Sequence, residues 1–175
     1  MWFLLKQIAH AGLPAEKAPE PNEAWRTERE QIQSNILSIL GRALCIRQVD
    51  AGSCNACELE IQALSNPYYN LEGLGIKFIA SPRHADMLLV TGPVTKNMEA
   101  ALKDAYDATP HPKLVVGIGE CAGNGGIFGE SYASCGGVSN VIPVDVVVPG
   151  CPPPPIDILR GILSAVTAKA GESGA

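Results

Sequence analysis

Four short runs of apolar residues constrain the fold of this chain more than any other feature of its sequence. They occupy residues 77–80, 87–90, 114–118 and 144–148. The runs are continuous instead of alternating, which is typical of strands buried on both faces of a parallel sheet. Stretches with helical periodicity lie before, between and after them, at residues 55–64, 95–108 and 156–168. This alternation of strand and helix predicts a doubly wound α/β domain.

The chain before these runs predicts one extra helix and an N-terminal segment. From residue 22 onwards one helical face carries Trp25, Ile32, Ile36, Leu40 and Ala43, and the helix is expected to end near Gly41. Three parts follow from this pattern. Residues 1–21 are predicted to be an interaction segment and linker, residues 22–170 the α/β domain, and residues 171–175 a disordered tail.

The first eleven residues predict a short amphipathic piece. Its apolar side chains are expected to share one side if the segment is helical: Trp2, Phe3, Leu5 and Ile8. Such a face would lie on a membrane surface or in a groove of a partner. A loosely ordered terminus docked on a neighbour explains the pattern equally well. No secretory signal is predicted, because Lys6 interrupts the apolar run, and no stretch approaches the roughly 20 apolar residues that span a bilayer.

The charge balance narrows the class of partners. Lys and Arg number 13 against 18 Asp and Glu, which gives a net charge of −5, and no basic run occurs. Nucleic acid is therefore not expected as a partner. Charged residues make up only 18% of the chain, so we expect other subunits to cover part of its surface. Without a secretory signal the chain is expected in the cytoplasm, where cysteine clusters usually hold metal.

Two of the six cysteines form a close pair at the start of a predicted helix. Cys54 and Cys57 follow a strand-like run at residues 46–49, and Asn55 and Glu58 have the spacing of a capping box. Cys57 is then expected in the first helical turn. There the free backbone N–H groups and the helix dipole lower the cost of a thiolate charge.

Two further cysteines each follow a predicted strand. Cys121 comes after the run at 114–118 and leads into glycines that let backbone N–H groups approach an anion. Cys151 comes after the run at 144–148 and precedes four prolines, which make a rigid turn. Ligands of an open parallel sheet bind beyond the carboxyl ends of its strands. Three strand ends therefore predict one site containing all four cysteines.

Four convergent thiolates are compatible with three kinds of site. A structural zinc site usually takes two close pairs of ligands, whereas here only Cys54 and Cys57 are close. A thioredoxin-like redox pair at those two positions would leave Cys121 and Cys151 without a role. An iron–sulfur cluster uses all four, and the spacing favours it. No ferredoxin-like run is present for a second cluster, so one cluster is expected.

The remaining cysteines are not needed for this site. Cys45 begins an apolar segment and is interpreted as a small buried hydrophobic residue. Cys135 follows Ser134 and precedes two glycines, in a segment expected to lie nearer the site. An unusual ligand role or a redox-sensitive thiol stays open for Cys135.

Four motifs occur in a consistent order between residues 46 and 163. They are GSCNACELEI at 52–61, SPRHADMLLVTG at 81–92, GECA and GGIF within 119–128, and PVD and PGCPP within 143–153. Together they resemble the small subunit of membrane-bound, energy-converting nickel-iron hydrogenases and formate hydrogenlyase. The 20 kDa subunit of respiratory complex I belongs to the same superfamily. Complex I relatives carry adjacent cysteines in the first motif, so the spaced pair favours the hydrogenase branch. Ala56, where a glycine is common, and Cys135 depart from the pattern.

The resemblance implies a flavodoxin-like domain with one 4Fe-4S cluster on Cys54, Cys57, Cys121 and Cys151. It implies an oxidoreductase subunit that passes electrons, while the catalytic centre belongs to a large subunit packed against it. A ferredoxin-like subunit and integral membrane subunits are the other expected partners. The expected location is peripheral, on the cytoplasmic face of the inner membrane. The alternative is a complex-I-like subunit whose large partner has no nickel-iron site.

A few other residues carry weaker expectations. Glu60 would relay protons near the cluster or simply lie on a helix surface. Arg83 and His84 precede a predicted strand, where they would tune the cluster or form an interface ion pair. His10 and His111 are isolated in the sequence and expected to face solvent.

Overall fold

The computed structural model describes residues 2–11 and 23–173 and contains a five-stranded sheet in the order β2-β1-β3-β4-β5. Every strand pairs in parallel with its neighbour. The strands are β1 (Leu44–Asp50), β2 (Ile76–Phe78), β3 (Met87–Thr91), β4 (Leu114–Ile118) and β5 (Val146–Val148). This is the flavodoxin-like strand order, so the predicted doubly wound fold is confirmed. Its order reverses direction between β1 and β3, where such sheets place ligands.

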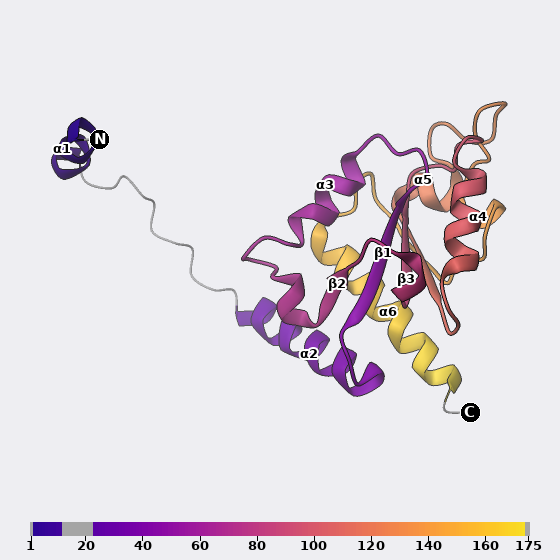
Figure 1. Ribbon diagram of the computed structural model, residues 1–175, viewed down its shortest axis with the longest axis horizontal. Helices are drawn as coiled ribbons and strands as arrows, with labels where there is room; N and C mark the ends of the chain where they lie inside the picture. Colours follow the sequence, from indigo (N-terminus) through magenta and orange to yellow (C-terminus); the bar gives the residue numbers. More distant parts are fainter. Residues whose placement is uncertain (1, 12–22, 174–175) are drawn as a thin grey trace.

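Helices cover both faces of the sheet (Figure 1). The helices are α1 (Trp2–Ala11), α2 (Glu23–Leu40), α3 (Ala56–Ala63), α4 (Glu99–Ala108), α5 (Gly119–Asn124) and α6 (Pro155–Ser173). Short 3-10 turns add η1 (Leu71–Leu74), η2 (Pro82–His84) and η3 (Val138–Asn140). Side chains of α2, α3 and α6 belong to one hydrophobic cluster, and side chains of α4 and α5 belong to the other. The sheet is therefore the middle of three layers.

The central strands explain why the apolar runs are continuous. All five residues of β3 and all five of β4 are buried. Met87 and Leu89 pack in the cluster with α2, α3 and α6, whereas Leu88 and Val90 pack in the cluster with α4 and α5. Successive side chains of a strand point to opposite faces, so a strand covered on both sides needs apolar residues at every position.

The extra N-terminal helix α2 packs where its pattern predicted. Ile32 and Ile36 are almost fully buried against the sheet. The helix ends at Leu40, and the backbone N–H of Gly41 donates to Leu37 O at 2.9 Å. On its exposed side Glu28 accepts from the Arg160 guanidinium of α6 at 2.7 Å. This exposed ion pair contributes about 0–1 kcal/mol, so the apolar contacts hold α2 in place.

One predicted helix begins later than expected. Residues 95–98 precede α4 because their backbone is used elsewhere: Thr95 forms an isolated bridge with Ser134, and Lys96 N donates to Ala133 O at 2.9 Å. The Thr95 hydroxyl donates to Ala51 O at 3.2 Å. These contacts join the loop after β3 to the loop at 130–135, so the helix starts only at Glu99.

The predicted division of the chain is partly outside the described residues. The predicted linker falls mostly on residues 12–22, and the end of the predicted tail on residues 174–175, which lie outside the described residues. Helix α6 continues to Ser173, and the boundaries at residues 21 and 170 stay predictions. Among the described helices, none is long and apolar enough to cross a membrane.

Candidate functional site

Four cysteines line one pocket beyond the carboxyl ends of the strands. Cys54 lies in the loop after β1, and Cys57 lies in the first turn of α3. Cys121 lies in α5 directly after β4, and Cys151 lies in the loop between β5 and α6. All six cysteines of the chain are free thiols. The structure therefore brings together the four side chains that the sequence placed at three strand ends.

Backbone hydrogen bonds hold the loops that carry these cysteines. Asp50, the last residue of β1, accepts with Oδ1 from the N–H groups of Gly52 and Ser53, both at 2.8 Å. An aspartate that bonds the backbone two and three residues ahead closes a tight turn, which positions Cys54. Glu120 N donates to Gly150 O at 3.0 Å. That bond ties the segment of Cys121 to the segment of Cys151.

Two glycines leave room for the sulfur atoms. A Cβ at Gly119 would lie 2.9 Å from Cys57 Sγ, and a Cβ at Gly126 would lie 2.6 Å from Cys121 Sγ. Both distances are too short for real contacts. Both residues also have positive φ, at +87° and +56°, which side chains other than glycine adopt only with strain. The glycine-rich sequence after Cys121 is thus needed for space as well as for the turn.

The four thiols differ in exposure and in proton affinity. Cys57 is only 8% exposed, Cys121 is half-buried, and Cys54 and Cys151 are exposed. Burial, followed by the charges of Glu58 and of the other three thiols, raises the pKa of Cys57 to about 11. Burial also raises the pKa of Cys121, followed by the charges of Cys151 and Cys54. These mutual effects show that the four thiols share one electrostatic environment.

The sequence predicted that the start of α3 stabilises the Cys57 thiolate. For the free thiol this prediction is wrong. Its position in the first turn of α3 is confirmed, but burial and neighbouring negative charge outweigh the helix dipole. A bound metal group would change this balance, because its positive charge stabilises the thiolate and the thiol releases its proton to solvent on coordination. The site suits a cationic group and disfavours four free thiolates.

Glu58, the neighbour of Cys57 in α3, is buried, which the sequence did not predict. The predicted capping box is wrong, because Asn55 has φ of 72° and its side chain caps no N–H group of α3. Glu58 instead turns inward: it is 6% exposed, and within the described chain neither carboxylate oxygen has a hydrogen-bond partner. Glu58 precedes the buried Ile61 by three residues, so helical phase could have placed it on the buried face.

The other two cysteines lie outside this pocket. Cys135 is buried and lines a separate cavity of about 230 Å³, where its thiol donates to Glu99 Oε2 at 3.3 Å and Lys96 is also present. It does not line the pocket of the four cysteines. Cys45 lies near the start of β1, the opposite end of that strand from the site, and is half-buried instead of fully buried as expected.

The weaker candidates are placed as follows. Glu60 is half-buried on α3, one residue from the exposed Leu59. Arg83 and His84 form part of η2 just before β3, as the sequence predicted, and both side chains face outward. His10 and His111 are exposed, which confirms their expected solvent contact.

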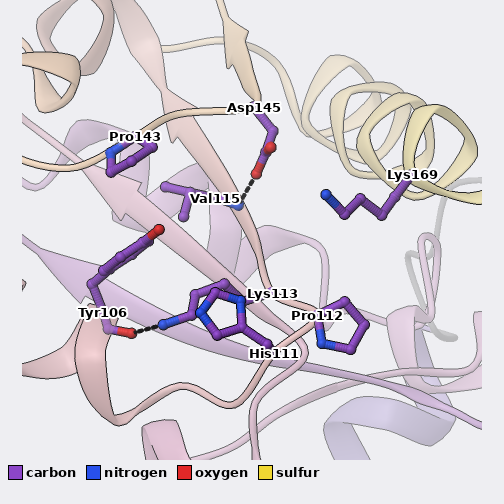
Figure 2. Close-up of a pocket in the computed structure, with 8 residues that line it drawn as sticks. All are labelled: Tyr106, His111, Pro112, Lys113, Val115, Pro143, Asp145 and Lys169. Carbon is purple, nitrogen blue, oxygen red and sulfur yellow. Dashed lines mark hydrogen bonds between the residues drawn. The ribbon is translucent and has the colours of Figure 1, made fainter. Parts of the chain in front are cut away.

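Another cavity, of about 440 Å³, lies beside the start of β4 and the segment before β5 (Figure 2). Its polar groups have structural partners. The Lys113 ammonium donates to the Tyr106 carbonyl in the last turn of α4 and lies 4.1 Å from the Tyr106 ring centroid. Asp145 Oδ2 accepts from Val115 N at 2.7 Å. Lys113 therefore caps the end of α4, where a cation is favourable, and this cavity is not the candidate site.

The donor set of the four-cysteine pocket fits an iron–sulfur cluster. Within the described residues, no three His, Cys, Asp or Glu side chains come together as a site for a single metal ion. A four-iron cluster is larger than one ion and takes four thiolates around its outside. Four free thiols carried by two loops and two helix starts, with two glycines against their sulfur atoms, suit such a group better than a single zinc ion.

Comparison with known proteins identifies the family of this chain. The family described as the 20 Kd subunit of NADH ubiquinone oxidoreductase matches residues 54–165. A probable membrane-bound hydrogenase subunit, mbhJ, from Pyrococcus furiosus is 44% identical over 83% of this chain and 87% of its own length. Formate hydrogenlyase subunit 7 from Escherichia coli is 42% identical over 77% of this chain, which spans 53% of that protein.

Solved structures share the fold. A chain of the membrane-bound sulfane sulfur reductase, an archaeal respiratory membrane complex, has a TM-score of 0.66 and 31% identity, covering 81% of this chain and 77% of that one. An NAD⁺-reducing nickel-iron hydrogenase has a TM-score of 0.57 at 16% identity, covering 73% and 93%, which supports the fold alone. The chain belongs to the family of the 20 Kd subunit of NADH ubiquinone oxidoreductase, within the superfamily that includes the small subunits of nickel-iron hydrogenases.

Proposed function

We propose that this chain holds one 4Fe-4S cluster on Cys54, Cys57, Cys121 and Cys151. In this proposal it passes electrons to a nickel-iron active site in the large subunit of a membrane-bound, formate hydrogenlyase-like hydrogenase complex. The observation that carries the proposal is the convergence of four free thiols on one pocket. The named relatives, a membrane-bound hydrogenase subunit and a formate hydrogenlyase subunit, support the choice of complex.

The residues of this chain have different roles around the proposed cluster. The four thiolates would hold it, and when bound it supplies one-electron transfer. Cys57 is buried on the sheet side, so it shields that side from water. Cys54 and Cys151 are exposed, so they mark the side from which a partner approaches. No residue of this chain needs to act on the substrate, because the catalytic centre is proposed for the partner.

The loop after α5 supports a partner on that exposed side. Phe128 lines the pocket of the four cysteines and is itself exposed. Ile127 and Tyr132, on the same loop, are 94% and 98% exposed. Large apolar side chains that gather at the rim of a site usually mark a contact with another protein. We assign this contact to the large subunit, with a ferredoxin-like subunit and integral membrane subunits as the further partners.

The proposed location is the cytoplasmic face of the inner membrane, where the chain would be peripheral. The support is the description of the first relative as membrane-bound, together with the lack of a spanning helix among the helices that the structure describes. The second candidate function is a complex-I-like oxidoreductase subunit with no nickel-iron partner. The family match favours it as an alternative, because that family is described by a complex I subunit.

The complex purified with this chain is expected to contain nickel and to evolve hydrogen from a low-potential one-electron donor. Metal analysis and gas chromatography check this. Two Cys-x-x-Cys pairs in the co-purified large subunit would agree, because such pairs supply thiolate ligands for nickel and iron. Iron without nickel, and no hydrogen, would transfer the assignment to the complex-I-like alternative and leave the cluster assignment intact.

A further inference from the structure

We propose that α1 is an interfacial helix that inserts Trp2, Leu5 and Ile8 into a lipid surface bearing anionic headgroups. The inference rests on the proposed function only in placing the chain beside a membrane. Helix α1 precedes the cysteine motifs in the sequence, and none of its described side chains lines their pocket. A failure of the lipid contact and a failure of the redox assignment can therefore be told apart.

The helical geometry of α1 produces an apolar side. Successive residues of a helix are about 100° apart, so Trp2, Leu5 and Ile8 fall within one third of the circumference. Phe3 falls about 100° from Trp2 on the side away from Leu5 and Ile8, which corrects the expectation that all four apolar residues share one face. An apolar stripe of this width on a short helix is typical of an interfacial segment.

The apolar side of α1 is exposed. Trp2, Leu5 and Ile8 are 73%, 54% and 46% exposed, and every α1 side chain whose exposure is described is exposed. Large apolar side chains exposed together on one helix usually mark a contact with a membrane or with another protein. Among the α1 side chains that the structure describes, none belongs to either hydrophobic cluster of the domain, so the domain does not cover them.

The charge of α1 favours a lipid surface over another protein as the contact of its apolar side. Helix α1 contains no Asp or Glu, and Lys6 gives it a positive charge, whereas the whole chain carries −5. The Lys6 ammonium lies 5.9 Å from the centroid of the Trp2 ring, at the border between the apolar and polar sides. A tryptophan with a lysine reaching outward beside it matches the boundary between acyl chains and anionic headgroups.

The small size of α1 also disfavours a protein groove. Ten residues offer far less area than the roughly 800 Å² per partner of a standard protein interface. A membrane surface makes no such demand, because a weak lipid contact adds to the binding of any other subunit already held there.

Flotation of the full chain with lipid vesicles tests the proposal. The chain should float with vesicles of phosphatidylcholine mixed with phosphatidylglycerol, and less with phosphatidylcholine alone. The double variant Leu5→Glu/Ile8→Glu should lower the bound fraction by about tenfold or more. The matched control is Leu37→Glu, which changes an equally exposed leucine on α2 and should leave flotation unchanged.

Fluorescence gives a second readout that does not depend on recovery from the gradient. The chain has two tryptophans, so Trp25→Phe leaves Trp2 as the single reporter. Its emission should shift to the blue and be quenched by brominated lipid. The proposal is overturned if the chain does not bind anionic vesicles, or if Leu5→Glu/Ile8→Glu floats with them as well as the unchanged chain does. It is also overturned if that variant loses only its co-purifying subunits, since α1 would then occupy a protein groove.

Discussion

Serine in place of any one of Cys54, Cys57, Cys121 or Cys151 is expected to remove or convert the cluster and to abolish electron transfer through the chain. All four thiols face one pocket, and a serine oxygen is a much poorer ligand for iron–sulfur clusters than a thiolate. Cys57→Ser should have the largest effect, because Cys57 is the buried ligand and its loss opens the inner side of the site. Iron and acid-labile sulfide, measured in each purified variant, give the result.

The same chain supplies the controls. Cys45→Ser changes a half-buried thiol at the far end of β1, and Cys135→Ser changes a buried thiol in a separate cavity. Both variants should keep their iron and sulfide. Full retention in Cys151→Ser together with loss in Cys135→Ser would overturn the ligand assignment.

Gly126→Ala is expected to lose most of the cluster although it changes no ligand. The new Cβ would lie 2.6 Å from Cys121 Sγ and 3.3 Å from Cys121 Cα, so the ligand and its backbone must both shift. A ligand displaced in this way no longer meets the geometry that the other three thiolates require. The visible absorption of the purified variant, and its bleaching on reduction, measure how much cluster remains.

Gly129→Ala is the matched control for Gly126→Ala. Gly129 has φ of +51° against +56° for Gly126, so both alanines carry the same strain of about 1–2 kcal/mol. A Cβ at Gly129 meets nothing within 4 Å, so only the contact with Cys121 differs between the two variants. Equal cluster content in both would show that the space beside Cys121 has no role.

The central strands of the sheet could be predicted from the sequence, because burial on both faces requires an unbroken run of apolar residues. β3 and β4 lie between two helical layers, so every residue of each strand is apolar or small. The edge strands were harder to predict from the sequence. The run at 144–148 becomes a strand only from Val146, because the Asp145 carboxylate accepts from Val115 N where a strand backbone would otherwise pair.

The position of the site was also predictable, for a topological reason. Parallel strands end at one edge, so cysteines that follow separate strands meet there regardless of their distance in sequence. The local chemistry was less predictable. The left-handed conformation of Asn55 removed the capping box and left Glu58 buried without a partner in the described chain. Burial, which is set by the tertiary fold, reversed the expected effect of the helix dipole on Cys57.

The iron and sulfide content that depends on Cys57 decides whether the four cysteines hold a 4Fe-4S cluster. The complex should be purified anaerobically with the unchanged chain and with Cys57→Ser, and iron, acid-labile sulfide and zinc counted in each. Clusters in the other subunits contribute equally to both preparations, so they do not affect the difference in iron and sulfide content between them. A single 4Fe-4S cluster predicts about four iron atoms and four sulfides fewer per complex in the variant. A difference of one zinc with no change in sulfide, or no difference at all, would contradict the account.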